Sequence, residues 1–235
     1  MRLGLGLGLA LGDSVGYDAT DPRKYGTPAW WHKSDAGITL NVSKVASWAD
    51  QSGNGNDVTQ GTDAARPTYF ASGGPNSYPS LKFNNQSLNK TLGSPIITTD
   101  WTVVLVCRAL STPTTSGTFL RHGHVTNNTG LDIASLGLQR QVTCKGVAIH
   151  ADGNMTADGW EVIAVSRANA AAPLLWSNNV SQTLTNTGIT GYNTGANTLD
   201  YGVAVNACEL AEVIAYKSVV DTTALVTALR TKYAI

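Results

Sequence analysis

The chain has 235 residues, with 16 basic and 16 acidic side chains and therefore no formal net charge. This length is enough for one large domain with a real core, and the charge balance argues against a protein that binds nucleic acid or an anionic membrane through a basic surface. Charged residues make up only 14% of the chain, and Gly, Thr, Asn and Ser fill the polar positions, which is typical of strands and tight turns. No apolar run approaches the ~20 residues that span a bilayer.

Residues 1–29 are predicted to form an extended docking arm and linker, ahead of one domain over residues 30–235. The arm alternates leucine with glycine, which would place all its leucines on one face of an extended strand and leave the other face nearly bare. Glycine weakens an isolated strand, so we expect the arm to become ordered only on a partner surface, to which it adds a strand or along which it packs. The partner-docking residues are then Leu3, Leu5, Leu7, Leu9 and Leu11.

Three other interpretations of the N-terminus are weaker. A signal peptide needs an unbroken apolar stretch and an A-x-A-like site, but glycine or alanine interrupts this one. A dinucleotide loop needs G-x-G-x-x-G within a βαβ unit, and neither is found. Gly12-Asp13-Ser14, with the later Gly55-Asn56-Asp57, is similar to blocks of SGNH-type esterases, but the last histidine is His150, too early to be their catalytic histidine.

The most informative stretch is the loop Trp48-Ala-Asp-Gln-Ser-Gly-Asn-Gly-Asn-Asp57, which follows a short apolar run. Glycine permits positive φ and asparagine tolerates it, so the loop is expected to be tight. Its many oxygen atoms suggest a calcium loop, although Gly61 stands where an EF-hand has its bidentate glutamate. The alternative is an Asx turn bonded to itself, which would pin the early strands. The calcium hypothesis assigns the ion to Asp50, Asn54, Asn56 and Asp57.

Short apolar segments separated by Gly, Asn and Asp turns predict a β-sandwich. The first strand is expected over 30–33, running into the turn Asp35-Ala36-Gly37. The continuous apolar runs that begin at Trp101 and Trp160 predict central strands, with both indole rings as core anchors. Further strands are expected over residues 81–83, 118–121, 130–133, 142–149, 174–176, 183–185, 199–205 and 209–216.

An amphipathic helix is expected to follow the last strand. Asp221 is a good N-cap for a helix over residues 222–233. Leu225, Leu229 and Tyr233 recur every four residues, so one apolar stripe should pack on the sandwich.

The residue types that usually carry catalysis are sparse. The three glutamates are Glu161, Glu209 and Glu212, and the last two are separated by an odd step, which predicts opposite faces of a regular strand rather than the pair ~5–5.5 Å apart of a retaining glycosidase. His122 and His124 could share one strand face as a metal pair, but no further ligand is identifiable, which favours loop histidines. The cysteines lack metal spacing and are expected to be buried thiols: Cys107, Cys144 and Cys208.

Motifs at both ends of the domain resemble one family. The loop Trp48–Asp57, then Arg66-Pro-Thr68, then Pro79-Ser-Leu-Lys-Phe83, resembles the start of a LamG-like domain. The segment 211–216, followed by a helix ending in Lys-Tyr, resembles the end of such domains in bacteriophage proteins, as does the Leu-Gly start. The resemblance implies an all-β, concanavalin A-like (LamG-like) jelly-roll sandwich with an extended N-terminal arm and one C-terminal helix.

The same resemblance implies a function. It suggests a non-enzymatic bacteriophage virion structural protein, such as a capsid decoration, head-fibre or tail-associated subunit, located on the particle surface. Its partners would be other virion proteins, meaning capsid or tail subunits, and further copies of itself in a homo-oligomer. LamG relatives often bind calcium, usually at a rim built from separate loops. The alternative function is a carbohydrate-binding adhesion module that recognises host surface glycans.

Overall fold

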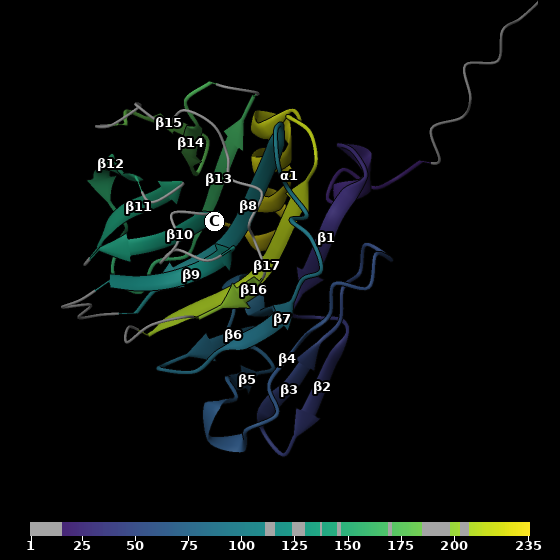
Figure 1. Cartoon of the computed structure of the whole chain (residues 1–235). Helices are drawn as coiled ribbons and strands as arrows, with labels where there is room; N and C mark the ends of the chain where they lie inside the picture. The colour runs from purple at the N-terminus through teal and green to yellow at the C-terminus, as the bar shows by residue number, and fades with distance from the viewer. Residues whose placement is uncertain are drawn as a thin grey trace, which may run out of the picture.

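The computed structural model describes residues 16–110, 116–123, 130–136, 138–144, 147–168, 171–184, 198–202 and 207–235. This part of the chain is mostly β-strand, with α1 (Thr222–Tyr233) as its one α-helix, and it confirms the expected all-β sandwich with a C-terminal helix (Figure 1). Within the same residues, no helix has the length and apolar character needed to cross a membrane. The leucines of the arm, Ser14 and His124 lie outside the described residues.

Strand β17 (Cys208–Tyr216) is the centre of one layer. On one side it pairs with β8 (Trp101–Ala109), and on the other it pairs in succession with β6 (Ser80–Phe83) and β1 (Pro28–Lys33). Beyond β8, the layer continues in pairing order through β13 (Glu161–Arg167), β14 (Leu174–Ser177) and β15 (Val180–Gln182). Because β8 and β17 are paired on both edges and covered on both faces, they are nearly continuous apolar runs, as expected of central strands.

The second layer is a longer antiparallel run of nine strands. Its members, in pairing order, are β2 (Ile38–Asn41), β3 (Lys44–Trp48), β4 (Val58–Thr59), β7 (Leu88–Thr91), β16 (Thr198–Tyr201), β9 (Ser116–His122), β10 (Leu131–Leu136), β11 (Gln139–Cys144) and β12 (Val147–Asn154). Strand β5 (Thr68–Phe70) pairs with both β3 and β6 and so joins the two layers. Figure 1 shows β2 to β5 gathered at the lower end of the molecule.

Two apolar clusters hold these layers together. The larger lies between the layers and includes three fully buried tryptophans, Trp30, Trp48 and Trp101, together with the three cysteines, which are buried and unpaired as expected. The smaller lies between the outer face of β8, β13 and β17 and the stripe of α1, whose Leu225 and Leu229 are completely buried. Burial of such a side chain stabilises the fold by roughly 1.5–3 kcal/mol.

The ends of α1 follow from its flanking residues. The side chain of Asp221 accepts a hydrogen bond from the Ala224 backbone N–H at 3.0 Å, which confirms the expected N-cap. At the other end Ala234 adopts a left-handed conformation, and its N–H bonds back to the last turn of the helix. Tyr233, the last helical residue, is fully buried, which completes the expected stripe.

The described part of the expected linker is packed against the sandwich. Asp21 caps a short 3₁₀ helix over Pro22–Lys24, and the hydroxyl of Tyr216 donates a hydrogen bond to the Pro22 carbonyl at 2.9 Å. Two further 3₁₀ turns, Asp63–Ala65 and Pro75–Ser77, lie in later loops. The division of the chain into a docking arm and a domain stays a prediction.

Two of the expected strands are corrected. Residues 142–149 are not one strand, because β11 ends at Cys144 and β12 begins at Val147, and these two residues pair directly. The strand expected over 183–185 is found instead at β15, which pairs with β14 across the turn residues Asn178 and Asn179, both with positive φ.

The prediction that Trp160 is a core anchor is also corrected. Trp101 is fully buried between the layers, as expected, but Trp160 is only partly buried and lies beside the smaller cluster, with the Arg108 guanidinium 5.0 Å from its ring centroid. The pairing of β8 with β13 explains the difference, because Trp101 and Trp160 open antiparallel strands at opposite ends and face opposite sides of the layer. An apolar run identifies a central strand but does not tell which of its faces is better covered.

Replacing these two tryptophans tests this assignment. Trp101→Ala should lower the free energy of unfolding by ~3–5 kcal/mol, because it leaves a large cavity in the main core. Trp160→Ala should cost roughly 1–2 kcal/mol, because it removes partial burial and one cation–π contact. Urea unfolding of both variants against the parent measures the difference, and equal losses would contradict the burial of the two rings.

Candidate functional site

The outer edge of β1 is covered by the loop Asp50–Asp57. The carboxylate Oδ1 of Asp50 accepts a hydrogen bond from the Trp31 backbone N–H at 2.8 Å, and the Gln51 N–H donates to the Trp31 carbonyl at 2.6 Å. The side-chain amides of Asn54 and Asn56 both donate to the Ala29 carbonyl, at 3.1 and 3.0 Å. The loop therefore supplies the partners that a neighbouring strand would supply, and closes an edge that is otherwise open to pairing.

Asp50 is the centre of this loop. Besides Trp31, its carboxylate accepts hydrogen bonds from the Ser52 N–H at 2.9 Å, the Ser52 hydroxyl at 2.8 Å and the Asn56 N–H at 2.9 Å. The Asp57 carboxylate accepts from the Asp50 N–H at 2.8 Å. Gly53 and Gly55 both have positive φ, 85° and 69°, which the tight path of the loop requires.

These contacts are those of the self-bonded Asx turn. Both oxygens of Asp50 accept two hydrogen bonds each, and the asparagine amides donate to backbone rather than turning their oxygens to a common centre. Across the described ranges, no group of three or more His, Cys, Asp or Glu side chains could hold a metal ion. A calcium ion bound by Asp50, Asn54, Asn56 and Asp57 stays a prediction.

Under the loop lies a buried polar cluster centred on His32. Its Nε2 lies 3.1 Å from the Asn56 carbonyl and its Nδ1 lies 2.9 Å from the Tyr201 hydroxyl. A neutral ring satisfies both contacts, with Nε2–H donating and Nδ1 accepting. The rings of Trp48 and Tyr201 enclose it, at centroid distances of 5.2 and 5.4 Å. Burial lowers the pKa of His32 to about 4, against the opposing pull of Asp50.

His122 is buried in the same core rather than placed in a loop, so the expectation of loop histidines is wrong for this residue. Its ring stacks on Trp30 with centroids 5.5 Å apart, and Nε2 accepts a hydrogen bond from the Ile96 N–H at 3.0 Å. Burial lowers its pKa to about 4. The predicted metal pair with His124 is not tested, because His124 lies outside the described residues.

Each of the three glutamates is buried and ion-paired. Glu161 accepts two hydrogen bonds from the Arg140 guanidinium, at 2.8 and 2.9 Å, and a third from the Ser177 hydroxyl. Glu209 accepts from Arg108 at 2.9 Å and from the Ser80 hydroxyl at 3.1 Å. With their oxygens held by these partners, neither carboxylate is placed to act on a substrate from solvent.

The third glutamate, Glu212, joins β1, β17 and α1. Its carboxylate accepts from the Trp31 indole N–H at 2.6 Å, and from the Lys232 ammonium and the Tyr233 hydroxyl, each at 2.8 Å. Glu212 is completely buried. Removing one partner of such a site leaves an uncompensated buried charge, which is strongly destabilising.

The expected placement of Glu209 and Glu212 on opposite faces is wrong. The register of β17 against β8 shifts between Leu210 and Glu212, so one extra residue, Ala211, interrupts the alternation. Both carboxylates therefore lie on the face that carries α1: Glu209 bonds Arg108 and Glu212 bonds Tyr233. A β-bulge cannot be read from the spacing of the residues alone.

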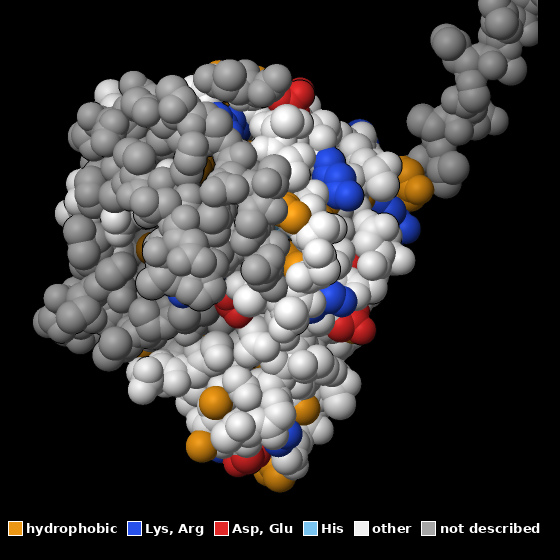
Figure 2. All heavy atoms as spheres, in the orientation of Figure 1, with side chains coloured by type: hydrophobic (Ala, Val, Ile, Leu, Met, Phe, Trp, Pro, Cys, Tyr) orange, Lys and Arg blue, Asp and Glu red, His pale blue; other side chains and the backbone are white. Residues whose placement is uncertain are grey.

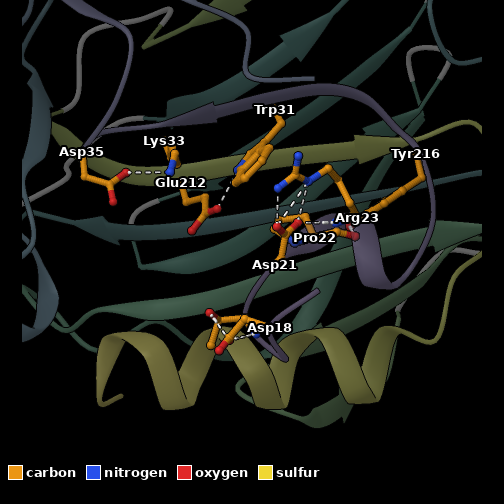
Figure 3. Close-up of polar contacts among 10 residues, drawn as sticks. Asp18, Asp21, Pro22, Arg23, Trp31, Lys33, Asp35, Glu212 and Tyr216 are labelled. Atoms are coloured by element: carbon orange, nitrogen blue, oxygen red, sulfur yellow. Dashed lines mark hydrogen bonds and ion pairs between the residues drawn. The ribbon is translucent and has the colours of Figure 1, made fainter. Parts of the chain in front are cut away.

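Figure 3 shows how the N-terminal segment lies on this face. The Arg23 guanidinium is held by the Asp21 carboxylate and lies 5.9 Å from the Trp31 ring centroid, and the Lys33 ammonium lies 5.2 Å from the same centroid. Lys33 also pairs with Asp35 at 3.8 Å. The Trp31 indole therefore donates its N–H to Glu212 and has the two cations Arg23 and Lys33 near its ring. These contacts hold residues 17–25 against β1.

The remaining surface offers shallow features. A hollow of about 400 Å³ lies between the end of β1, the loop and the residues after β17; it is lined by Thr27, Pro28, Ala29, Asn54, Lys217 and Ser218. On the face in view in Figure 2, the apolar side chains of the described residues lie in small patches, some of them at the lower end where β2, β3 and β5 lie. The exposed large apolar residues of those elements and their turn are Leu40, Val42 and Phe70.

Comparison with known proteins supports the fold. No family model matches the sequence, and no curated protein matches it. Among solved structures, the receptor-binding domain of botulinum neurotoxin type G has a TM-score of 0.62 at 10% identity over 89% of this chain and 51% of that one. The botulinum neurotoxin D ligand-binding domain, in complex with N-acetylneuraminic acid, has a TM-score of 0.63 at 9% identity over 88% and 50%.

A third similar structure is the binding domain of Paraclostridial Mosquitocidal Protein 1, with a TM-score of 0.64 at 11% identity over 88% of this chain and 52% of that one. The chain therefore spans about half the length of these structures. At this level of identity the likeness shows the fold alone. By their names, the three are a receptor-binding, a ligand-binding and a binding domain.

The buried histidines make stability depend on pH. Burial lowers the pKa of His32 and of His122 to about 4 in the folded state, below the usual 6.5. The unfolded chain then binds more protons between these values, so the free energy of unfolding should fall as pH drops through this window, by roughly 2 kcal/mol per histidine from about pH 7 to about pH 5. Urea unfolding at the two pH values measures this loss. His122→Gln should reduce the slope, and an unchanged slope in that variant would contradict the assignment.

The Asx loop can be tested with Asp50→Asn. The amide would turn an N–H toward donors of the loop, so we expect a loss of about 2–3 kcal/mol in the free energy of unfolding, similar with calcium and with a chelator. Asp63→Asn is a matched control, because Asp63 is an exposed carboxylate paired with Lys44 and Arg66 on the surface. A melting temperature that rises with calcium in the parent but not in Asp50→Asn would show an ion site instead.

Proposed function

We propose that this protein is a non-enzymatic bacteriophage virion structural protein, a decoration, head-fibre or tail-associated subunit that displays its jelly roll on the particle surface. The observation that carries the proposal is the anchoring of the N-terminal segment. Tyr216 bonds the Pro22 carbonyl and Arg23 lies over Trp31, so the chain before residue 16 starts from a fixed point beside β1 and β17. In this proposal the Leu-Gly arm, which precedes the anchored segment in the chain, docks on capsid or tail subunits.

The features of the sandwich support the non-enzymatic part of this proposal. Its three glutamates are all consumed by buried ion pairs, which leaves none of them for the two-carboxylate chemistry of glycosidases. The loop Asp50–Asp57 closes the edge of β1, so the sandwich does not offer that edge to a partner strand. The virion context rests on the resemblance of the terminal motifs, and so does the expected homo-oligomer.

Carbohydrate binding is the second candidate function. It is favoured by the fold, because the similar solved structures are named as receptor-binding, ligand-binding or binding domains, and one of them is in complex with N-acetylneuraminic acid. Since this chain matches about half of that structure, the position of its ligand is not transferred. The two functions are compatible in one protein, since an outward-facing sandwich on a docked arm can also adhere to a host glycan.

Removal of the arm tests the first function. Deleting residues 1–12 should abolish attachment to particles while leaving the melting temperature of the protein nearly unchanged. The reason is that leucines on a Leu-Gly strand gain only by burial, at roughly 1.5–3 kcal/mol each, and a partner surface provides that burial. A full-length variant with serine at positions 3, 5, 7, 9 and 11 is the matched control for arm length and should also fail to attach. Truncated protein that still decorates virions would overturn the proposal.

A further inference from the structure

The outward face of the second layer carries a row of charged residues that the sequence analysis did not single out. Strands β16, β9 and β10 place Asp200 directly opposite Arg121, and Arg121 directly opposite Asp132. The row continues on both sides, with Asn89 of β7 opposite Asp200 and Thr143 of β11 opposite Asp132. Five polar residues on five adjacent strands thus span on the order of 20 Å.

The neighbours of these residues show which way the row points. Each charged residue stands between two residues of the main core, which lies between the layers. Because successive side chains of a strand point to opposite faces, the row faces away from the core. The flanking core residues are Leu199 and Tyr201 around Asp200, Leu120 and His122 around Arg121, and Leu131 and Ile133 around Asp132.

The hydrogen bonding of the row is incomplete. An Arg121 terminal nitrogen lies 3.2 Å from Asp132 Oδ2, and the Thr198 hydroxyl donates to Asp200 Oδ2 at 2.7 Å. Asp132 Oδ1 and Arg121 Nε are both buried without a hydrogen-bond partner among the described residues, although Asp132 is only 8% exposed. Burial raises the pKa of Asp132, against the pull of Arg121 and of a hydrogen bond from the Thr118 side chain. An unused acceptor and an unused donor therefore lie on neighbouring residues, which is costly unless a ligand or water completes them.

We propose that this row, Asp200–Arg121–Asp132, binds a neutral oligosaccharide. A sugar hydroxyl both donates and accepts, so adjacent hydroxyls match a carboxylate oxygen beside a guanidinium N–H. Two carboxylates around one guanidinium leave the row net negative, which disfavours a sialylated sugar. The proposal rests on the second candidate function and gives it a position and a ligand class.

A metal ion does not fit the same residues. Directly opposed residues on paired strands have Cβ atoms about 5 Å apart, so the two aspartates, separated by Arg121, are about 10 Å apart. Calcium holds its oxygen ligands at about 2.3–2.6 Å. The guanidinium between them would also repel a cation. Hydrogen bonding to an extended polyhydroxylated chain uses the whole row, whereas an ion would use one end.

The experiment is a calorimetric titration of the full chain with a panel of neutral cello-, malto-, xylo- and chito-oligosaccharides, with sialyllactose as the anionic comparison. We expect at least one neutral oligosaccharide to bind with favourable enthalpy, and Asp132→Asn and Arg121→Gln each to weaken that binding about 10-fold or more, the effect of losing one charge-assisted hydrogen bond. Asp63→Asn, an exposed carboxylate outside the row, should bind like the parent.

Amide chemical shifts of the unmodified protein provide a measurement that does not depend on folding of the variants. On titration, the amides of residues 120–122, 131–133 and 199–201 should move first. If the row variants bind the sugar like the parent and the amide chemical shifts move elsewhere, the row is not the binding site, although the protein still binds glycans. If no neutral oligosaccharide binds, or if sialyllactose alone binds, the proposal is wrong, and in the first case the arm-docked display function stands without a sugar ligand.

Discussion

The interaction on which the rest of the structure depends is the capture of the β1 edge by Asp50. One carboxylate holds the Trp31 N–H and three donors of its own loop, and the loop in turn supplies partners to the carbonyls of β1. Unpaired backbone groups at a sheet edge are costly when buried and invite pairing with other chains when exposed. Because β1 is held in this way, two consecutive residues point to opposite faces of the strand. Trp30 packs in the main core, and Trp31 packs in the smaller cluster under α1, where it bonds Glu212.

The second constraint on the packing of the core comes from its buried carboxylates and imidazole rings. All three glutamates lie in the interior with a basic partner, and two neutral histidines contact aromatic rings, His122 stacked on Trp30 and His32 tilted against Trp48. Such groups add little net stability compared with apolar residues of the same shape, but they tolerate few alternative packings because each loss leaves an unpaired group. Glu212 illustrates this, since its oxygens tie the edge strand, the central strand and the last turn of the helix to one position.

These two constraints bear on which parts of the molecule are placed to contact other molecules. In the described part of the chain the three glutamates are held in ion pairs, and the proposed function assigns contacts with other molecules to the surface and to the N-terminal arm. Residues 17–25 are packed beside β1 and β17, and the polar row on β16, β9 and β10 lies on the outward face of the second layer. The botulinum neurotoxin type G receptor-binding domain has a similar fold.

The sequence by itself determined the fold class, most of the strands, the capped C-terminal helix and the presence of a tight loop at residues 48–57, because these depend on local periodicity and turn chemistry. Only the tertiary structure decided which face of a strand is covered, as for Trp160 against Trp101, and where a bulge reverses the alternation, as at Ala211 between Glu209 and Glu212. The row Asp200–Arg121–Asp132 was equally hidden: each residue is an ordinary charge between two apolar neighbours, and strand register alone brings the three together. Register depends on contacts between residues far apart in the chain, and spacing along one strand does not encode them.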